Sequence, residues 1–325
     1  MKKIRVGYPA ILETAARSAL PPEVVFVPLE DSLDHEVEID VWIPDPYQTR
    51  ARRVWPWLRG VRLVLSLMAG TEWIPATVGP QVTICNAHGA HNIPTAEWTI
   101  SAILAMLKQF PLFLDIQHSA NWRRRKEAAQ EYARLTGDTR QHHPDVMAEE
   151  LTGKTVLLVG YGAIGQEIER MLAPFCVEPI RIARNARAAP RVHAVSALDS
   201  MLPLAEIIVL ILPLTDESRG LIGARQFALM RQGALLVNSA RGAIVQTDAL
   251  VNALNQGKIR AALDVTEPEP LPPEHPLWRC PNLLITPHVA GSSPQFAERA
   301  FKVAAAELRR YLNGEPFHNA VHLAS

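Results

Sequence analysis

Three side chains in the second half of the sequence could together act on a small carboxylic acid: Arg241, Glu269 and His288. An arginine presents a fixed cation to a carboxylate, and a histidine can exchange a proton near neutral pH. A carboxylate beside that histidine raises its pKa and keeps it protonated. Hydride transfer to a 2-oxo acid needs these three groups. Glu269 is the predicted partner of His288, and nearby Glu267 is the alternative.

Predicted strands place all three side chains at one edge of a parallel sheet. Each side chain follows a short run typical of a buried strand, and these runs are Ala234–Asn238, Ala261–Val265 and Leu283–Thr286. Ligands bind at the carboxyl ends of the strands in open α/β sheets. Taken singly, each side chain could be an ordinary surface or loop residue. The strand-end position of all three favours a common site.

A glycine-rich segment, Gly160-Tyr161-Gly162-Ala163-Ile164-Gly165, joins a predicted strand, Thr155–Val159, to a predicted helix, Ala163–Leu172. Glycines at this spacing permit a tight turn, a close approach of the backbone to a pyrophosphate, and close packing of helix on strand. The helix N-terminus adds a positive dipole end. The pattern alone also marks simple turns, but its position between strand and helix predicts a dinucleotide site.

Two basic residues, Arg184 and Arg187, follow the next predicted strand, Ile180–Ala183, together with the polar Asn185. An acid about 20 residues beyond the glycines would bind the ribose hydroxyls of NAD, whereas an arginine suits the 2′-phosphate of NADP. The sequence therefore favours NADP(H) as the cofactor. NAD(H) stays open, because the segment could also be a solvated basic turn.

The bulk composition is that of a two-domain globular protein. A chain of 325 residues suits two domains, and its 33 basic and 33 acidic residues balance. We therefore expect neither a nucleic-acid partner nor a membrane partner. The three cysteines form no C-x-x-C pair, and the adjacent His142 and His143 do not predict a metal site. We expect no signal peptide, because Arg5 and Gly7 break the apolar run near the N-terminus, and we therefore expect a cytoplasmic protein.

Strand and helix patterns alternate along most of the chain, which predicts an α/β fold with parallel sheets. Further predicted strands are Ile4–Tyr8, Val24–Leu29, Val37–Ile43, Arg62–Leu67, Thr83–Asn86, Val192–Val195 and Ile207–Leu212. A helix should begin after Pro94 with Thr95 as its cap, and the last helix should span Pro294 to Leu312. The charged segment Ser119–Glu150 is predicted as an excursion between two domains, with an exposed helix over Arg124–Leu135.

Four ordered motifs make the chain resemble the D-isomer-specific 2-hydroxyacid dehydrogenase family. They are Leu212-Pro213-Leu214-Thr215, Asn238-Ser239-Ala240-Arg241-Gly242, Leu263-Asp264-Val265 and Thr286-Pro287-His288-Val289-Ala290-Gly291. The resemblance covers nearly the whole chain. It implies a Rossmann-type doubly wound parallel sheet inserted into a flavodoxin-like α/β substrate domain. The substrate domain would comprise residues 1–95 and 292–325, and the dinucleotide-binding domain residues 96–291, with an interface arm at about 119–150 in a homodimer.

The resemblance also implies a role for each matching residue. Arg241 would hold the substrate carboxylate, His288 would exchange the proton, and Glu269 would bind the imidazole. The implied cofactor-binding residues are Gly160, Gly162, Ala163, Ile164, Gly165, Arg184, Asn185, Arg187, Leu212, Pro213, Ala240, Arg241, Asp264, His288 and Gly291. Asp264 would sit beside the nicotinamide. The implied substrate-binding residues are Ala69, Gly70, Thr71, Arg241 and His288.

Departures from the family pattern occur in the first domain. The family usually has a Gly-x-Asp turn after the strand that corresponds to Arg62–Leu67, whereas this chain has Gly70-Thr71-Glu72, with a longer acidic side chain. His91 or Asn92 could face either substrate or solvent. The predicted reaction is a glyoxylate- or hydroxypyruvate-type reduction, yielding a 2-hydroxy acid of D configuration. Phosphoglycerate or phosphite oxidation is less favoured, because no regulatory extension follows the last helix and the Leu67–Glu72 turn has no lysine. A non-enzymatic, nucleotide-sensing, corepressor-like protein is the alternative from another class.

Overall fold

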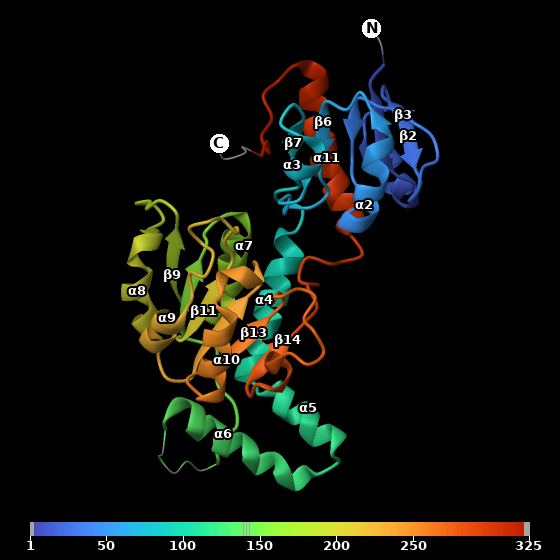
Figure 1. The fold of residues 1–325 in the computed structure, drawn as a ribbon. Coiled ribbons are helices and arrows are strands. Elements are labelled where there is room, and N and C mark those ends of the chain that lie inside the picture. The colour runs from blue at the N-terminus through green and yellow to red at the C-terminus, as the bar shows by residue number, and fades with distance from the viewer. Residues whose placement is uncertain (1–2, 139, 141, 143, 322–325) are drawn as a thin grey trace. The chain divides into compact units, whose positions relative to one another are not determined.

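A computed structural model describes residues 3–138, 140, 142 and 144–321 (Figure 1). The chain forms two compact units, which are described separately. The first unit comprises Met1–Asn92 and Ser292–Ser325, and the second comprises Ile93–Gly291. The chain thus passes from the first unit into the second just before the predicted boundary at residues 95 and 96.

The second unit contains a parallel sheet of seven strands in the order β10-β9-β8-β11-β12-β13-β14. Its strands are β8 (Thr155–Val159), β9 (Glu178–Ala183), β10 (His193–Ala194), β11 (Ile207–Leu210), β12 (Ala234–Asn238), β13 (Ile259–Leu263) and β14 (Leu283–Ile285). Renumbered within the unit, this order is 3-2-1-4-5-6-7, which is the Rossmann arrangement with one added strand. The order reverses between β8 and β11, where such sheets bind dinucleotides.

The central strands of this sheet are apolar along their whole length because both faces are covered. Leu157, Ile208 and Leu236 face one hydrophobic cluster, and alternate residues such as Val209 and Val237 face the other. The first cluster includes residues of α8 (Leu198–Met201), α9 (Ala224–Leu229) and α10 (Thr247–Asn255). The second includes residues of α4 (Asn92–Leu107) and α7 (Ala163–Leu172). The sheet is therefore a rigid base for the loops at its carboxyl edge.

The first unit contains a five-stranded parallel sheet in the order β2-β1-β4-β6-β7. Its strands are β1 (Arg5–Pro9), β2 (Val25–Leu29), β4 (Val41–Trp42), β6 (Leu63–Leu65) and β7 (Thr83–Cys85). This is the flavodoxin-like order 2-1-3-4-5. Its helices are α1 (Glu13–Ala19), α2 (Gln48–Val54), α3 (Ile74–Val78) and α11 (Phe296–Asn313), and α11 packs against α1.

Three boundary predictions are corrected by the structure. The single strand Val37–Ile43 is two strands: β3 (Val37–Glu38) pairs separately with β5 (Leu58–Arg59), while β4 joins the main sheet. Asp40 lies between the two strands, and its carboxylate accepts a hydrogen bond from the Arg5 amide at 2.9 Å. Helix α4 begins before Pro94, and Thr95 is buried inside it instead of capping it. The last helix begins at Phe296 instead of Pro294.

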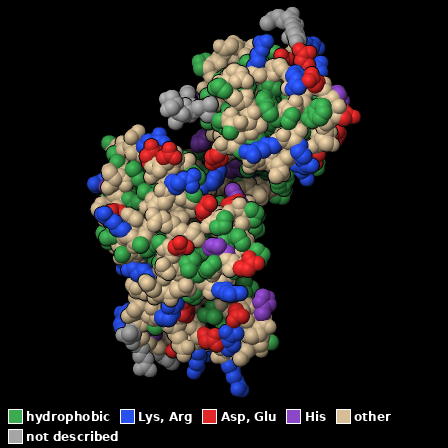
Figure 2. Space-filling view, viewed as in Figure 1, with side chains coloured by type: hydrophobic (Ala, Val, Ile, Leu, Met, Phe, Trp, Pro, Cys, Tyr) green, Lys and Arg blue, Asp and Glu red, His purple; other side chains and the backbone are tan. Residues whose placement is uncertain are grey.

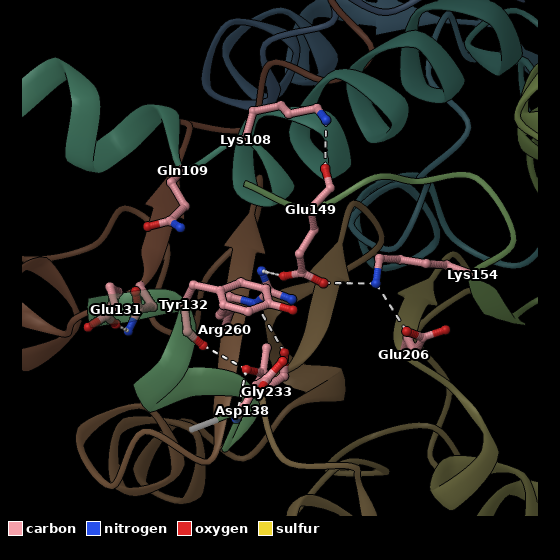
Figure 3. A network of polar contacts seen from close by, with 12 residues as sticks. Lys108, Gln109, Glu131, Tyr132, Asp138, Glu149, Lys154, Glu206, Gly233 and Arg260 are labelled. Atoms are coloured by element: carbon pink, nitrogen blue, oxygen red, sulfur yellow. Dashed lines mark hydrogen bonds and ion pairs between the residues drawn. The ribbon is translucent and has the colours of Figure 1, made fainter. Parts of the chain in front are cut away.

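The charged segment at residues 119–150 belongs to the second unit, which corrects its prediction as an excursion between domains. It contains a 3-10 turn (Trp122–Arg125) and α6 (Lys126–Thr136), and it follows α5 (Phe110–His118). Figure 3 shows what holds it: Glu149 contacts the buried Arg260 at 2.7 Å and Lys154 at 2.8 Å. Lys154 continues the network to Glu206 at 3.0 Å. These ion pairs fix the end of the segment beside the starts of β8, β11 and β13.

The distribution of charged side chains on the surface agrees with the equal numbers of basic and acidic residues in the sequence. On the face shown in Figure 2, basic and acidic side chains are interspersed. Within the described part of the chain, no single helix is long and apolar enough to cross a membrane. One pair, α4 with α5, reaches that length and composition together but is bent by 66°.

Candidate active site

The structure places Arg241, Glu269 and His288 in loops that follow β12, β13 and β14. These strands are neighbours, so their loops meet at one edge of the sheet. Gly242 allows the first two loops to touch, because a Cβ added there would lie 2.0 Å from the carbonyl oxygen of Thr266. Any larger residue at this position would push the Arg241 loop away from the Glu269 loop.

His288 and Glu269 form a hydrogen-bonded pair. The Nδ1 atom of His288 lies 2.5 Å from Oε1 of Glu269, and both side chains are about two-fifths exposed, at 44% and 40%. The hydrogen bond and the charge of Glu269 raise the pKa of His288, against the opposing effects of burial and of Arg241. The same hydrogen bond lowers the pKa of Glu269. Both shifts favour an imidazolium–carboxylate pair, with Nε2 left to exchange a proton.

We predict that Glu269→Gln moves the alkaline limb of the reductive pH–rate profile to lower pH. The amide can keep a hydrogen bond to His288 but removes the negative charge, so the pKa of the histidine falls. The protonated form that reduction requires is then lost at a lower pH. Steady-state rates from pH 5 to 10 measure the shift. Glu267→Gln is the matched control, and a shift in the control without one in Glu269→Gln would reverse the assignment.

Asn238 fixes the backbone around Arg241. Its side-chain amide donates to the Arg241 carbonyl at 3.0 Å and accepts from the Ala240 amide at 3.1 Å. Ser239 lies 3.2 Å from the hydroxyl of Thr99 on α4. Arg241 is near enough to lower the pKa of both His288 and Glu269. The site thus places a cation near an imidazole that can exchange a proton. Sequence reasoning missed the supporting contacts of Asn238 and Thr99, because these depend on tertiary packing.

The glycine loop has the geometry of a phosphate-binding turn. Gly160 has a φ of +107°, and a Cβ there would lie 2.3 Å from the Ile211 carbonyl oxygen. A Cβ on Gly165 would lie 2.5 Å from the Gly160 carbonyl oxygen, so the helix packs tightly on the strand. At Gly162, which precedes α7, an added Cβ would meet no described atom within 4 Å. That space beside a helix N-terminus fits the pyrophosphate of a nicotinamide dinucleotide.

The remaining predicted cofactor residues belong to the start of α7 or follow other strands of this sheet, and Arg187 makes an unexpected contact with the glycine loop. Arg184 and Asn185 are exposed after β9, while Leu212 and Pro213 follow β11. Arg187 donates a hydrogen bond to the Tyr161 carbonyl at 2.7 Å and lies over the Tyr161 ring at 5.5 Å. Arg187 therefore braces the glycine loop, a role that the residue spacing did not reveal. Ala163 and Ile164 open α7, Ala240 adjoins Arg241, and Gly291 ends the second unit.

The predicted substrate residues Ala69, Gly70 and Thr71 lie in the first unit, after β6. Thr71 is buried, and its carbonyl accepts from the Ile74 amide at 2.9 Å. His91 is also buried rather than exposed to solvent, and its ring stacks on Phe296 at 5.4 Å. The part of these residues in substrate binding stays a prediction.

No group of three or more potential metal-binding side chains occurs among the residues that the structure describes. His142 contacts Asp138 at 3.0 Å, and its neighbour His143 lies outside the described residues.

Comparison with known proteins gives consistent similarities. A family model for the "D-isomer specific 2-hydroxyacid dehydrogenase, NAD binding domain" matches residues 100–290. A glyoxylate reductase of Aeropyrum pernix is 33% identical over 268 residues, covering 81% of this chain and 76% of that protein. A D-3-phosphoglycerate dehydrogenase of Methanocaldococcus jannaschii is 31% identical over 255 residues, covering 77% of this chain and 45% of that protein.

A solved structure extends the similarity to the whole fold. It is a D-isomer-specific 2-hydroxyacid dehydrogenase from Xanthobacter autotrophicus, in complex with NADPH and MES. Its TM-score is 0.76 at 26% sequence identity, and the match covers 99% of this chain and 98% of that one.

Proposed function

Because the chain belongs to the D-isomer-specific 2-hydroxyacid dehydrogenase family, we propose that it reduces small 2-oxo acids of the glyoxylate and hydroxypyruvate type to D-2-hydroxy acids, with NADP(H) as cofactor. The observation that carries this proposal is the pairing of His288 with Glu269 beside the cation of Arg241. Similarity to a glyoxylate reductase supports the substrate class.

The side chains divide the work of this reaction. The nicotinamide ring, when bound, supplies the hydride. The guanidinium of Arg241 binds the substrate carboxylate and orients the 2-oxo group. His288, protonated through its contact with Glu269, donates a proton from Nε2 to the carbonyl oxygen. In the oxidative direction the neutral imidazole takes the proton back from the 2-hydroxyl group.

Oxidation of a phosphoglycerate is a second candidate, supported by the similarity to a D-3-phosphoglycerate dehydrogenase. A steady-state screen separates the two. The proposal predicts the highest kcat/KM with glyoxylate or hydroxypyruvate, ahead of pyruvate, bulkier 2-oxo acids and phosphohydroxypyruvate. A clear preference for the phosphorylated acid would favour the second candidate.

We predict that NADPH is preferred over NADH and that Arg184→Asp reverses this preference. Arg184 is exposed after β9, where a guanidinium can pair with a 2′-phosphate. Loss of a charge-assisted contact worth about 1.5–3 kcal/mol lowers kcat/KM for NADPH by roughly 10- to 150-fold. NADH kinetics of the same variant are the control and should change little. A wild-type protein that works better with NADH would contradict this assignment.

We predict that the protein is a homodimer and that the segment at residues 119–150 with α5 forms its interface. Three large apolar side chains are exposed here: Phe110 at 54%, Leu114 at 52% and Trp122 at 82%. Leu114→Glu combined with Trp122→Glu should produce a monomer, because buried carboxylates oppose association. Light scattering measures the mass, and Leu204→Glu, at a similarly exposed position, is the control. A monomeric wild-type protein would rule out this prediction.

A further inference from the structure

His288 has a backbone conformation that an ordinary residue rarely adopts. Its φ is +54°, in the left-handed region. A histidine held there costs free energy unless its surroundings fix it, and such residues often occur at functional sites. The contacts that hold this backbone therefore also decide where the imidazole lies.

The buried side chain of Asp264 makes those contacts. Its Oδ1 atom accepts a hydrogen bond from the Thr286 hydroxyl at 2.6 Å and another from the Val289 amide at 2.8 Å. Its Oδ2 atom accepts from the Ala290 amide at 2.8 Å. The Asp264 carbonyl accepts from the His288 amide, also at 2.8 Å. One residue, 2% exposed, thus holds the chain on both sides of His288.

The sheet register explains this arrangement. Leu263 on β13 pairs with Ile285 on β14, so Asp264 and Thr286 leave the sheet side by side. Hydrogen bonds to a carboxylate are stronger than those between neutral groups. Without them, the chain from Thr286 to Ala290 could relax to a more common conformation. The imidazole would then turn away from Glu269.

We propose that Asp264 is a positioning residue for proton transfer, whose buried carboxylate fixes the backbone at Thr286–Ala290 so that Nδ1 of His288 meets Glu269. This role is additional to a place beside the nicotinamide. It rests on the proposed function only in so far as His288 is the proton donor. The hydrogen bonds by which Asp264 fixes the backbone around His288 are present in the free protein, whatever the reaction.

Three charged groups act on the titration of His288, and they must be separated in any test. Glu269 raises the pKa of His288 through its hydrogen bond and its charge, Arg241 lowers it, and the charge of Asp264 raises it slightly. Asp264→Asn removes both a charge and a fitting acceptor. Thr286→Val removes one hydrogen bond to Asp264 and leaves every charge in place, so it isolates the positioning effect.

The test is an NMR pH titration of the histidines in the cofactor-free full-length protein. The signal of His288 is assigned by its loss in His288→Gln. We expect its midpoint to fall in Asp264→Asn, and to fall by a smaller amount in Thr286→Val, as contact with Glu269 weakens. In parallel, kcat for 2-oxo acid reduction should drop on the order of 100-fold in Asp264→Asn, the cost of misplacing a reacting group by about 1 Å. Glu267→Gln should leave both readouts unchanged.

An unchanged midpoint in Thr286→Val would overturn the proposal, because Asp264 would then act through its charge alone. So would an Asp264→Asn protein that only binds cofactor more weakly. If Asp264→Asn does not fold, the titration midpoint of His288 in Thr286→Val tests the proposal alone. Failure of the proposed function looks different: the wild-type protein would reduce no 2-oxo acid, while the midpoint of His288 would still respond to both substitutions.

Discussion

His288→Ala is expected to lower kcat for 2-oxo acid reduction by roughly 10²–10⁴-fold, the usual contribution of a positioned acid–base group. The reason is geometric as well as electrostatic. Glu269 lies 2.5 Å from Nδ1 of His288 and raises the pKa of that histidine, so the wild-type ring is both oriented and more readily protonated. Alanine leaves only water to protonate the developing alkoxide.

Steady-state kinetics with saturating NADPH measure this loss, and fluorescence titration measures cofactor affinity. The affinity should change little, because the glycine loop that binds the pyrophosphate is untouched. His35→Ala, at an exposed histidine of the first unit, is the control. If His288→Ala retains activity within tenfold of wild type, another group must donate the proton.

Arg241→Ala is expected to lower kcat/KM by about 10²–10³-fold, as removal of a preorganised electrostatic group typically does. The substrate carboxylate loses its cation before and during hydride transfer, so KM should rise and kcat should fall together. Arg241→Lys keeps the positive charge but cannot form bidentate hydrogen bonds to a carboxylate, so it should recover only part of the lost kcat/KM.

The direction in which the pH–rate profile of Arg241→Ala shifts is an independent test of the same assignment. Arg241 lowers the pKa of His288, so its removal should raise that pKa and move the alkaline limb to higher pH. This is the opposite direction to Glu269→Gln. Equal profiles for Arg241→Ala and wild type would mean that Arg241 lies too far from His288 to share a site.

Much of the fold could be predicted from the sequence, because the pattern that defines many of its strands and helices lies within one short stretch of residues. The strand before Gly160 and the helix after it could be predicted from residue types alone, and so could the buried strand Ala234–Asn238. The prediction of a single strand over Val37–Ile43 was wrong, because an apolar run does not show that its two halves join different sheets. The segment at 119–150 looked solvated because Glu149 and its buried partner Arg260 are far apart in sequence.

Less of the candidate site could be predicted from the sequence. Spacing alone could not decide between Glu267 and Glu269, because both lie in an irregular loop, and the structure puts Glu269 on His288. The positive φ of His288 has no sequence signature, and neither has the contact of Arg187 with Tyr161. These features arise where loops from neighbouring strands meet.

The most direct test of the account is the product of hydroxypyruvate reduction by the purified protein with NADPH. We expect stoichiometric oxidation of NADPH and formation of D-glycerate, with the rates of both lowered by roughly 10²–10⁴-fold in His288→Ala. A protein that binds the nucleotide yet reduces no 2-oxo acid would instead behave as a nucleotide sensor, and would contradict the account.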